Sequence, residues 1–204
     1  MSFNVTVLKE AFYSLFMSMK DGNNDTFAKG VANAVTAFVA TGQVTTVDGG
    51  AIAEGAFSGG GIGSLTVIPS DCSSVIISAC KNMKGDPYGN YYFAQEMGHA
   101  LKNMADRGTV TVTVTGTVTT PGGVTHTTGG EATGTISCDS SSLVQGLYET
   151  FTQMWNRREE DRYNGNLRFA EKLAQEINDF FTSGTVSTDG TGAIAGSSGT
   201  GTIA

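Results

Sequence analysis

Charged side chains are scarce in this sequence of 204 residues, and so is proline. Lys, Arg, Asp and Glu together make up 15% of the chain, against roughly 25% in an average globular domain. Proline occurs 3 times, whereas glycine occurs 28 times. Few solvating charges and many glycines favour close backbone approach and one shared core over several separately solvated units.

The sequence also lacks an excess of positive charge. Its formal net charge is -7 and its isoelectric point is about 4.7, so it is poorly suited to neutralising a phosphate backbone. The densest group of arginines, Arg157, Arg158 and Arg162, is interrupted by acidic residues at 159–161 that cancel it locally. We therefore expect no direct nucleic-acid partner.

Membrane and secretion signals are missing as well. No apolar run reaches the roughly 18 residues of a membrane-spanning helix. The first residues have neither the basic nor the apolar region of a secretory signal. We expect no membrane partner.

Cysteine and histidine are too few and too scattered for a metal centre. Cys72, Cys80 and Cys138 are odd in number and form no CxxC pair, which argues against a zinc knuckle and a disulfide framework and favours reduced thiols. Neither His99, placed off the apolar side of a predicted helix, nor His126, near a predicted turn, has ligands at metal-binding spacing. We expect no metal and no cofactor.

One acidic run imitates a calcium-binding loop without completing it. Asp21, Asn23 and Asp25 match the first, third and fifth loop positions, but Thr26 replaces the required glycine and Ala32 the final glutamate. We interpret the run as a turn in which Asp25 or a neighbour caps the next helix.

The sequence contains no recognisable catalytic motif. The glycine run at 59–63 is not followed by a lysine-containing helix start, so it is a poor phosphate cradle and is interpreted as a loop. No Gly-x-Ser-x-Gly turn joins a strand to a helix, although a dispersed Ser-His-Asp arrangement remains open. We expect a protein that is not an enzyme.

One sequence pattern, in contrast, occurs three times. Apolar residues at offsets 0, 4, 8 and 11, then glycine at offset 15, describe one side of a helix that ends at glycine before a strand. The three copies are Phe27, Val31, Val35, Phe38, Gly42 and Val44; Phe93, Met97, Leu101, Met104, Gly108 and Val110; and Phe169, Leu173, Ile177, Phe180, Gly184 and Val186. They predict an α+β protein with tandem units at 1–68, 69–137 and 138–204, sharing one core.

Each unit is predicted to contain two helices followed by a Gly/Thr-rich β-hairpin. The predicted helices lie at about 5–20, 25–41, 71–83, 91–106, 140–154 and 167–182, with 157–162 extending the fifth. The predicted strands lie at 43–47, 62–67, 109–119 and 124–136, and 184–188 opens the last hairpin. Within 109–119 Val alternates with Thr, which indicates a half-buried strand with a polar Thr face.

The hairpins carry almost no charge to protect their strand edges. They could pair inside the chain as a closed sheet, add to a neighbouring subunit, or do both. The predicted assembly residues are Val44, Thr46, Val110, Val112, Val114, Val186, Thr188 and Ile203, and the predicted helix-to-strand pivots are Gly42, Gly108 and Gly184. The units could stack, or close around an axis with pseudo-threefold symmetry.

Short motifs resemble structural proteins of tailed bacteriophages. They are Phe27-Ala28 with Thr41-Gly42-Gln43-Val44-Thr45-Thr46, and Phe169-Ala170 with Ser183-Gly184-Thr185-Val186-Ser187-Thr188. The resemblance implies a virion component and does not say which. Together with the threefold pattern, the uncharged hairpins and the lack of catalytic motifs, it leads us to expect a neck, tail or baseplate ring subunit, or a capsid decoration protein, assembled in the host cytoplasm. Its expected partners are itself and other virion proteins, through strand edges. The alternative is a host-surface or carbohydrate-binding module that uses hairpin tips such as 121–128.

Overall fold

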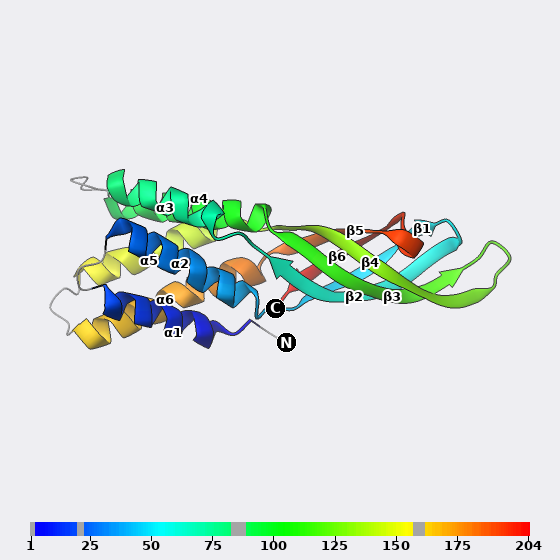
Figure 1. Cartoon of the computed structure of the whole chain (residues 1–204), viewed down its shortest axis with the longest axis horizontal. Helices are drawn as coiled ribbons and strands as arrows, with labels where there is room; N and C mark the ends of the chain where they lie inside the picture. Colours follow the sequence, from blue (N-terminus) through cyan, green and yellow to red (C-terminus); the bar gives the residue numbers. More distant parts are fainter. Residues whose placement is uncertain (1–2, 20–22, 83–88, 157–161) are drawn as a thin grey trace.

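The protein consists of a helical bundle and a β-barrel placed end to end (Figure 1). The computed structural model describes residues 3–19, 23–82, 89–156 and 162–204. Six α-helices form the bundle, and six antiparallel strands form a closed barrel. The predicted α+β class is confirmed.

Helix pairs and strand pairs alternate along the chain. The helices are α1 (Val5–Ser18), α2 (Asn24–Val39), α3 (Ser70–Asn82), α4 (Gly89–Asp106), α5 (Ser141–Asn156) and α6 (Arg162–Thr182). The strands are β1 (Val44–Ile52), β2 (Gly55–Thr66), β3 (Thr109–Thr119), β4 (Thr125–Ser137), β5 (Thr185–Gly190) and β6 (Ser197–Ile203), with a short 3-10 helix η1 (Gly192–Ile194) before β6. Two helices therefore precede two strands three times in succession.

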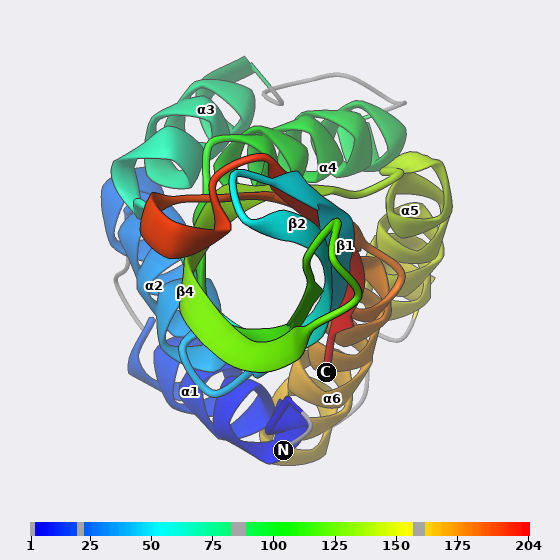
Figure 2. The ribbon, with the colours of Figure 1, turned by 90° about the vertical axis from the view of Figure 1, so that its right-hand side faces the viewer.

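The six helices form a closed ring. Each helix packs against its neighbours in sequence, and α6 returns to pack against α1, so the ring encircles the long axis of the molecule (Figure 2). The predicted apolar helix positions point inward, and the buried ones are Val31, Val35, Phe38, Phe93, Met97, Leu101, Met104, Leu173, Ile177 and Phe180. Phe27 and Phe169 are partly buried and pack against this core.

Phenylalanines from five helices form a ring of their own in the bundle. Successive ring centroids lie 4.8 to 6.4 Å apart around the circuit Phe16, Phe27, Phe93, Phe151, Phe169 and back to Phe16. Such distances are typical of packed aromatic pairs. The first residue of each repeated pattern thus contributes to one shared aromatic cluster.

Two helix starts show how local and tertiary forces act. Asn23 caps α2, because its side-chain oxygen accepts the N–H of Thr26 at 2.9 Å; the expected cap is therefore a neighbour of Asp25.

Helix α6 begins at Arg162, earlier than the predicted 167. The cost of Gly165 in a helix is about 1 kcal/mol, and packing of Tyr163 against Tyr13, with ring centroids 5.6 Å apart, offsets it. The rest of the predicted extension, 157–161, lies outside the described residues.

The barrel closes within the chain. Each strand pairs with the next, and β6 pairs with β1 from Val44↔Ile203 to Gly50↔Ser197. Gln43 and Ala204 continue this pairing with two backbone hydrogen bonds of 2.8 and 3.1 Å. In β3 the valines are buried and all the threonines are exposed, which confirms the predicted polar Thr face.

The glycine run at 59–63 lies inside a strand, so its interpretation as a loop is wrong. Residues 59–63 belong to β2, and only Ala53 and Glu54 connect β1 to β2. The reason is steric: a β-carbon on Gly63 would collide with the backbone oxygen of Thr111 on β3. Glycine therefore permits a strand approach here that larger residues prevent.

Candidate functional site

The three predicted pivots lie buried where a helix gives way to a strand. A β-carbon on Gly42 would collide with the ring of Phe3, and one on Gly108 would come within 2.8 Å of Leu65. At Gly184 the same atom would lie 2.6 Å from Ile136. Glycine at these positions lets each helix end pack directly on the core below it.

A second set of glycines occupies matching places near the ends of β2, β4 and β6. A β-carbon on Gly63, Gly134 or Gly201 would collide with the backbone oxygen of a residue on the adjacent strand. The oxygens belong to Thr111, Ser187 and Thr45, respectively. These three contacts join each strand pair to the next around the barrel. In the β2–β3 ladder, β-carbons on Gly55, Gly59 and Gly116 would also meet backbone oxygens of the adjacent strand.

The eight predicted assembly residues lie inside the barrel. All of them are at most 6% exposed: Val44, Thr46, Val110, Val112, Val114, Val186, Thr188 and Ile203. Closure of the sheet explains this, since alternate side chains of every strand must face the barrel axis. These residues stabilise the barrel, and a partner that approaches the closed barrel meets other side chains.

The outer surface of the barrel carries hydroxyl groups and almost no charge. All 12 Lys and Arg residues lie outside 43–68, 109–138 and 185–204. The exposed side chains of β3 are threonines, and their cross-strand neighbours include Ser64 and Thr133, both paired with Thr111. Two large apolar side chains interrupt this surface, Val47 (76% exposed) on β1 and Ile62 (59% exposed) on β2. They lie diagonally across the β1–β2 ladder, since Ile62 pairs with Thr45.

A buried carboxyl group lies inside the barrel. Asp48 is 3% exposed. Its oxygens accept hydrogen bonds from the hydroxyl groups of Thr46 at 2.6 Å and Thr188 at 3.3 Å. Gly199 provides the room, because a β-carbon there would collide with the Asp48 carboxyl group. The two hydroxyl groups give the buried carboxyl group the hydrogen-bond partners that a polar group in a protein core needs.

The distal end of the barrel is formed by two turns. The hairpin that joins β3 to β4 projects beyond the other strands (Figure 1). Its tip exposes Val124 (64%). On the inner side of the hairpin, His126 pairs with Glu54 of the β1–β2 turn, with 2.8 Å between Nε2 and Oε2. This contact connects the two turns across the mouth of the barrel.

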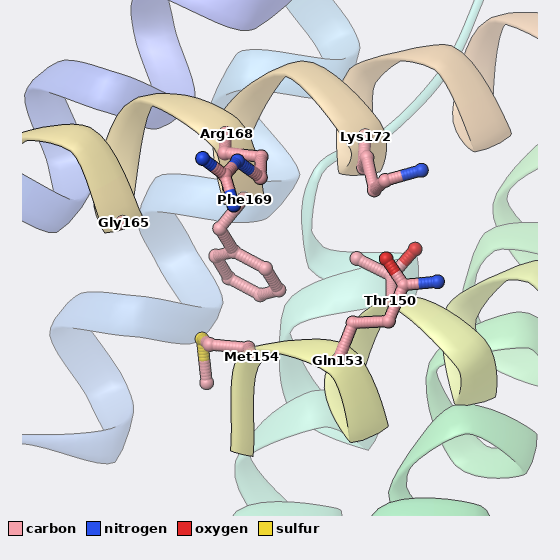
Figure 3. Close-up of a pocket in the computed structure, with 7 residues that line it drawn as sticks. All are labelled: Thr150, Gln153, Met154, Gly165, Arg168, Phe169 and Lys172. Carbon is pink, nitrogen blue, oxygen red and sulfur yellow. The ribbon is translucent and has the colours of Figure 1, made fainter. Parts of the chain in front are cut away.

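A small hollow lies between α5 and α6 in the bundle (Figure 3). Its volume is about 50 Å³, and it is lined by Thr150, Gln153, Met154, Gly165, Arg168, Phe169 and Lys172. Figure 3 shows the ring of Phe169 directed toward Met154, with Arg168 and Lys172 on the α6 side. The described lining residues include two cations, Arg168 and Lys172, but the volume admits little more than one or two water molecules.

Metal-binding groups and cysteine thiols are the remaining features that could carry chemistry. Within residues 3–19, 23–82, 89–156 and 162–204, no group of three or more His, Cys, Asp and Glu could hold a metal ion. Burial raises the pKa of the Cys72 thiol to about 12, and burial together with the nearby Asp106 raises the pKa of Cys138 to about 12. Both thiols are therefore protonated at neutral pH and weakly nucleophilic. No described helix is long and apolar enough to cross a membrane.

Sequence reasoning missed three features of the barrel: Asp48, the His126–Glu54 pair and the exposed Val47 and Ile62. Strand alternation from Val44 was enough to place Asp48 inside. The His126–Glu54 contact joins residues 72 positions apart, and no local sequence pattern predicts it.

No protein-family model matches the chain, and no curated protein sequence or solved structure matches it.

Proposed function

We propose that this protein is a non-enzymatic structural building block of a virion. The observation that carries the proposal is the closure of three successive helix-pair and strand-pair segments around one axis (Figure 2). We infer that these segments are tandem repeats related by pseudo-threefold symmetry. A single chain then has the approximate form of a trimer of its own units.

The matching glycines support the repeat interpretation. Gly42, Gly108 and Gly184 occupy equivalent helix-to-strand junctions. Gly63, Gly134 and Gly201 each face a backbone oxygen on an adjacent strand. A triplicated unit would keep glycine at the same crowded positions in each copy. These two sets of three glycines fit that expectation.

A pseudo-threefold chain suits a symmetric shell. It can occupy a threefold position as one molecule, or join a neck, tail or baseplate ring as one subunit. The elongated form favours a protein fixed by one end, and among these roles it agrees best with capsid decoration (Figure 1). The proposed partners remain further copies of the chain and other virion proteins, and the proposed location is the virion.

The test is incorporation into particles. The purified protein is added to particles that lack it, and its copy number is measured by quantitative mass spectrometry and its position by electron microscopy. We expect a fixed stoichiometry and density at symmetric positions. A protein that remains outside every particle, as a lone monomer, contradicts the proposal.

The projecting hairpin favours a second candidate, a host-surface or carbohydrate-binding module. Its tip at 121–128 is largely solvent-exposed, and its one titratable side chain is His126, which contacts Glu54. Glycan-array binding that is lost when 121–124 is replaced by Gly-Ser residues would favour this function. The matched control is Thr111→Ser on the barrel wall, which should leave binding unchanged.

A further inference from the structure

One part of β4 has a strand partner on one side only. Strand β4 pairs with β3 from residue 125 to residue 134, but with β5 only from 132 to 137. Just beyond the β5 pairing, Thr191 donates its N–H and its hydroxyl to the Glu131 carbonyl, both at 2.8 Å. The short helix η1 packs beside β4 next to this contact, with Ile194 close to Gly130. Residues 125–129 lie on the tip side of Gly130, and we call them the tip edge.

The Glu131 contact shows which backbone groups face outward. Its carbonyl points toward the β5 side, and in an antiparallel ladder the N–H and C=O of alternate residues point to the same side. The N–H and C=O groups of Thr125, Thr127 and Gly129 therefore also point away from β3. Within the described residues, no strand pairs with them on that side.

The tip edge lacks the usual protection against edge pairing. Exposed edges normally carry Lys, Pro, a bulge or a covering segment. The tip edge reads Thr-His-Thr-Thr-Gly, with Thr125, His126, Thr127 and Gly129 exposed. Its one titratable side chain, His126, is turned to the inner face, where it pairs with Glu54.

We propose that the tip edge pairs with the tip edge of a second copy of this chain. An antiparallel arrangement about a twofold axis places Thr127 opposite Thr127 and Thr125 opposite Gly129. Each such pair exchanges both N–H···O=C bonds, because all three residues direct these groups outward. A strand edge is complementary to itself in this arrangement, and the interface is isologous.

A second copy is the favoured occupant for two reasons. The other strands of the closed barrel are paired on both sides over most of their described lengths. Among the described strands, the tip edge is therefore the longest unpaired edge. The hairpin also projects along the long axis, so two molecules can meet tip to tip with both bundles far apart (Figure 1). The inference deepens the proposed function, on which it rests for its role in a particle.

The test uses a charge swap at the twofold axis. Sedimentation and small-angle X-ray scattering of the purified chain should show a concentration-dependent dimer with nearly twice the monomer's maximum dimension. Thr127→Lys and Thr127→Glu each place like charges opposite one another, so each should raise the dimer dissociation constant about fivefold or more. A mixture of the two variants should recover a one-to-one heterodimer.

Two control variants distinguish pairing at the tip edge from a general effect of added charge. Thr111→Lys adds the same charge to the outer face of β3, which is paired on both sides, and should leave the dimer intact. Thr127→Pro removes an outward N–H and should abolish the dimer. A wild-type chain that stays monomeric at millimolar concentration, or a mixture without heterodimer, overturns the inference. Neither result bears on incorporation into particles, which is measured separately with the wild-type chain.

Discussion

The bundle and the barrel are stabilised in different ways. Of the twelve largest fully buried side chains, all but Ile136 lie in helices. The ion pairs Lys9–Glu171, Lys29–Asp25, Lys102–Asp106 and Arg107–Asp71 also belong to the bundle and its junctions. The barrel has valines, threonines and glycines where the bundle has large apolar side chains. Its one described contact between an acidic and a basic side chain is the hydrogen bond of His126 with Glu54.

The difference follows from where each architecture finds the partners for its backbone hydrogen bonds. Helices satisfy their own hydrogen bonds, so their stability in the bundle depends on burying large apolar side chains. A narrow closed barrel satisfies the backbone between strands and has little interior volume, so it requires small side chains and close strand contact. The bundle should therefore be sensitive to lost volume and the barrel to added volume.

The largest expected effect is a loss of volume in the bundle. Leu101 in α4 is fully buried. Leu101→Ala should lower the free energy of unfolding by about 4 kcal/mol, through lost apolar burial and the cavity left behind. The measurement is chemical denaturation. As a control, Ile62→Ala on the exposed outer face of the barrel should change the free energy of unfolding by less than about 0.5 kcal/mol. Similar losses for both variants would contradict the comparison.

The next effect is added volume in the barrel. Gly134→Ala should destabilise the protein by about 3 kcal/mol, because the added methyl group meets the Ser187 backbone oxygen and no rotamer relieves the contact. Gly122→Ala is the control in the same hairpin, since its nearest neighbouring atom would lie 3.9 Å away. Thermal and chemical unfolding measure both variants.

The same substitution in the bundle should have the opposite sign. A β-carbon on Gly165 in α6 would meet no atom of the described residues within 4 Å apart from the backbone of its own helix. Gly165→Ala should stabilise the protein by about 0.5 to 1 kcal/mol through helix propensity, and thermal unfolding measures the gain. A stabilising Gly134→Ala would remove the distinction between the two parts.

A smaller effect concerns the polar interior of the barrel. Thr46→Val removes the 2.6 Å hydrogen bond to Asp48 while keeping the side-chain shape, and should lower the free energy of unfolding by about 1 to 2 kcal/mol. Thr111→Val makes the same change on the outer face, where water replaces the hydroxyl partner, and should be nearly neutral. Chemical denaturation compares the two variants. Equal effects would mean that the Asp48 contact contributes nothing specific.

The smallest effect is a pH dependence in the bundle. Partial burial, with Asp179 and Glu149 nearby, raises the pKa of Glu176. The folded state then binds this proton more readily than the unfolded state, so stability falls as pH rises from the ordinary Glu pKa through the folded value. Glu176→Gln should therefore stabilise the protein slightly at pH 7 and not at pH 3, as measured by denaturation at both pH values. Glu171→Gln, beside Lys9, should show no such gain.

Much of the local structure was predictable because its signals are periodic. The recurring apolar positions of Phe27, Phe93 and Phe169 placed three helices, and the glycines after them marked the ends. The Val–Thr alternation placed β3 and its faces. The start of α6 and the strand character of 59–63 were not predicted, because tertiary contacts of Tyr163 and close strand approach at Gly63 override the local signals of glycine.

By itself, then, the sequence determined the order of helices and strands, their apolar faces and the glycines between them, since these depend on neighbours within a few turns of chain. Only the tertiary structure decided that the hairpins close on one another. Closure depends on the register between strands as distant in sequence as β1 and β6. Backbone hydrogen bonds have the same chemistry whichever strand provides them, so the local sequence does not identify the partner strand. Closure placed Val44, Thr46 and Asp48 inside the barrel and left one short edge, at the tip of β4, exposed.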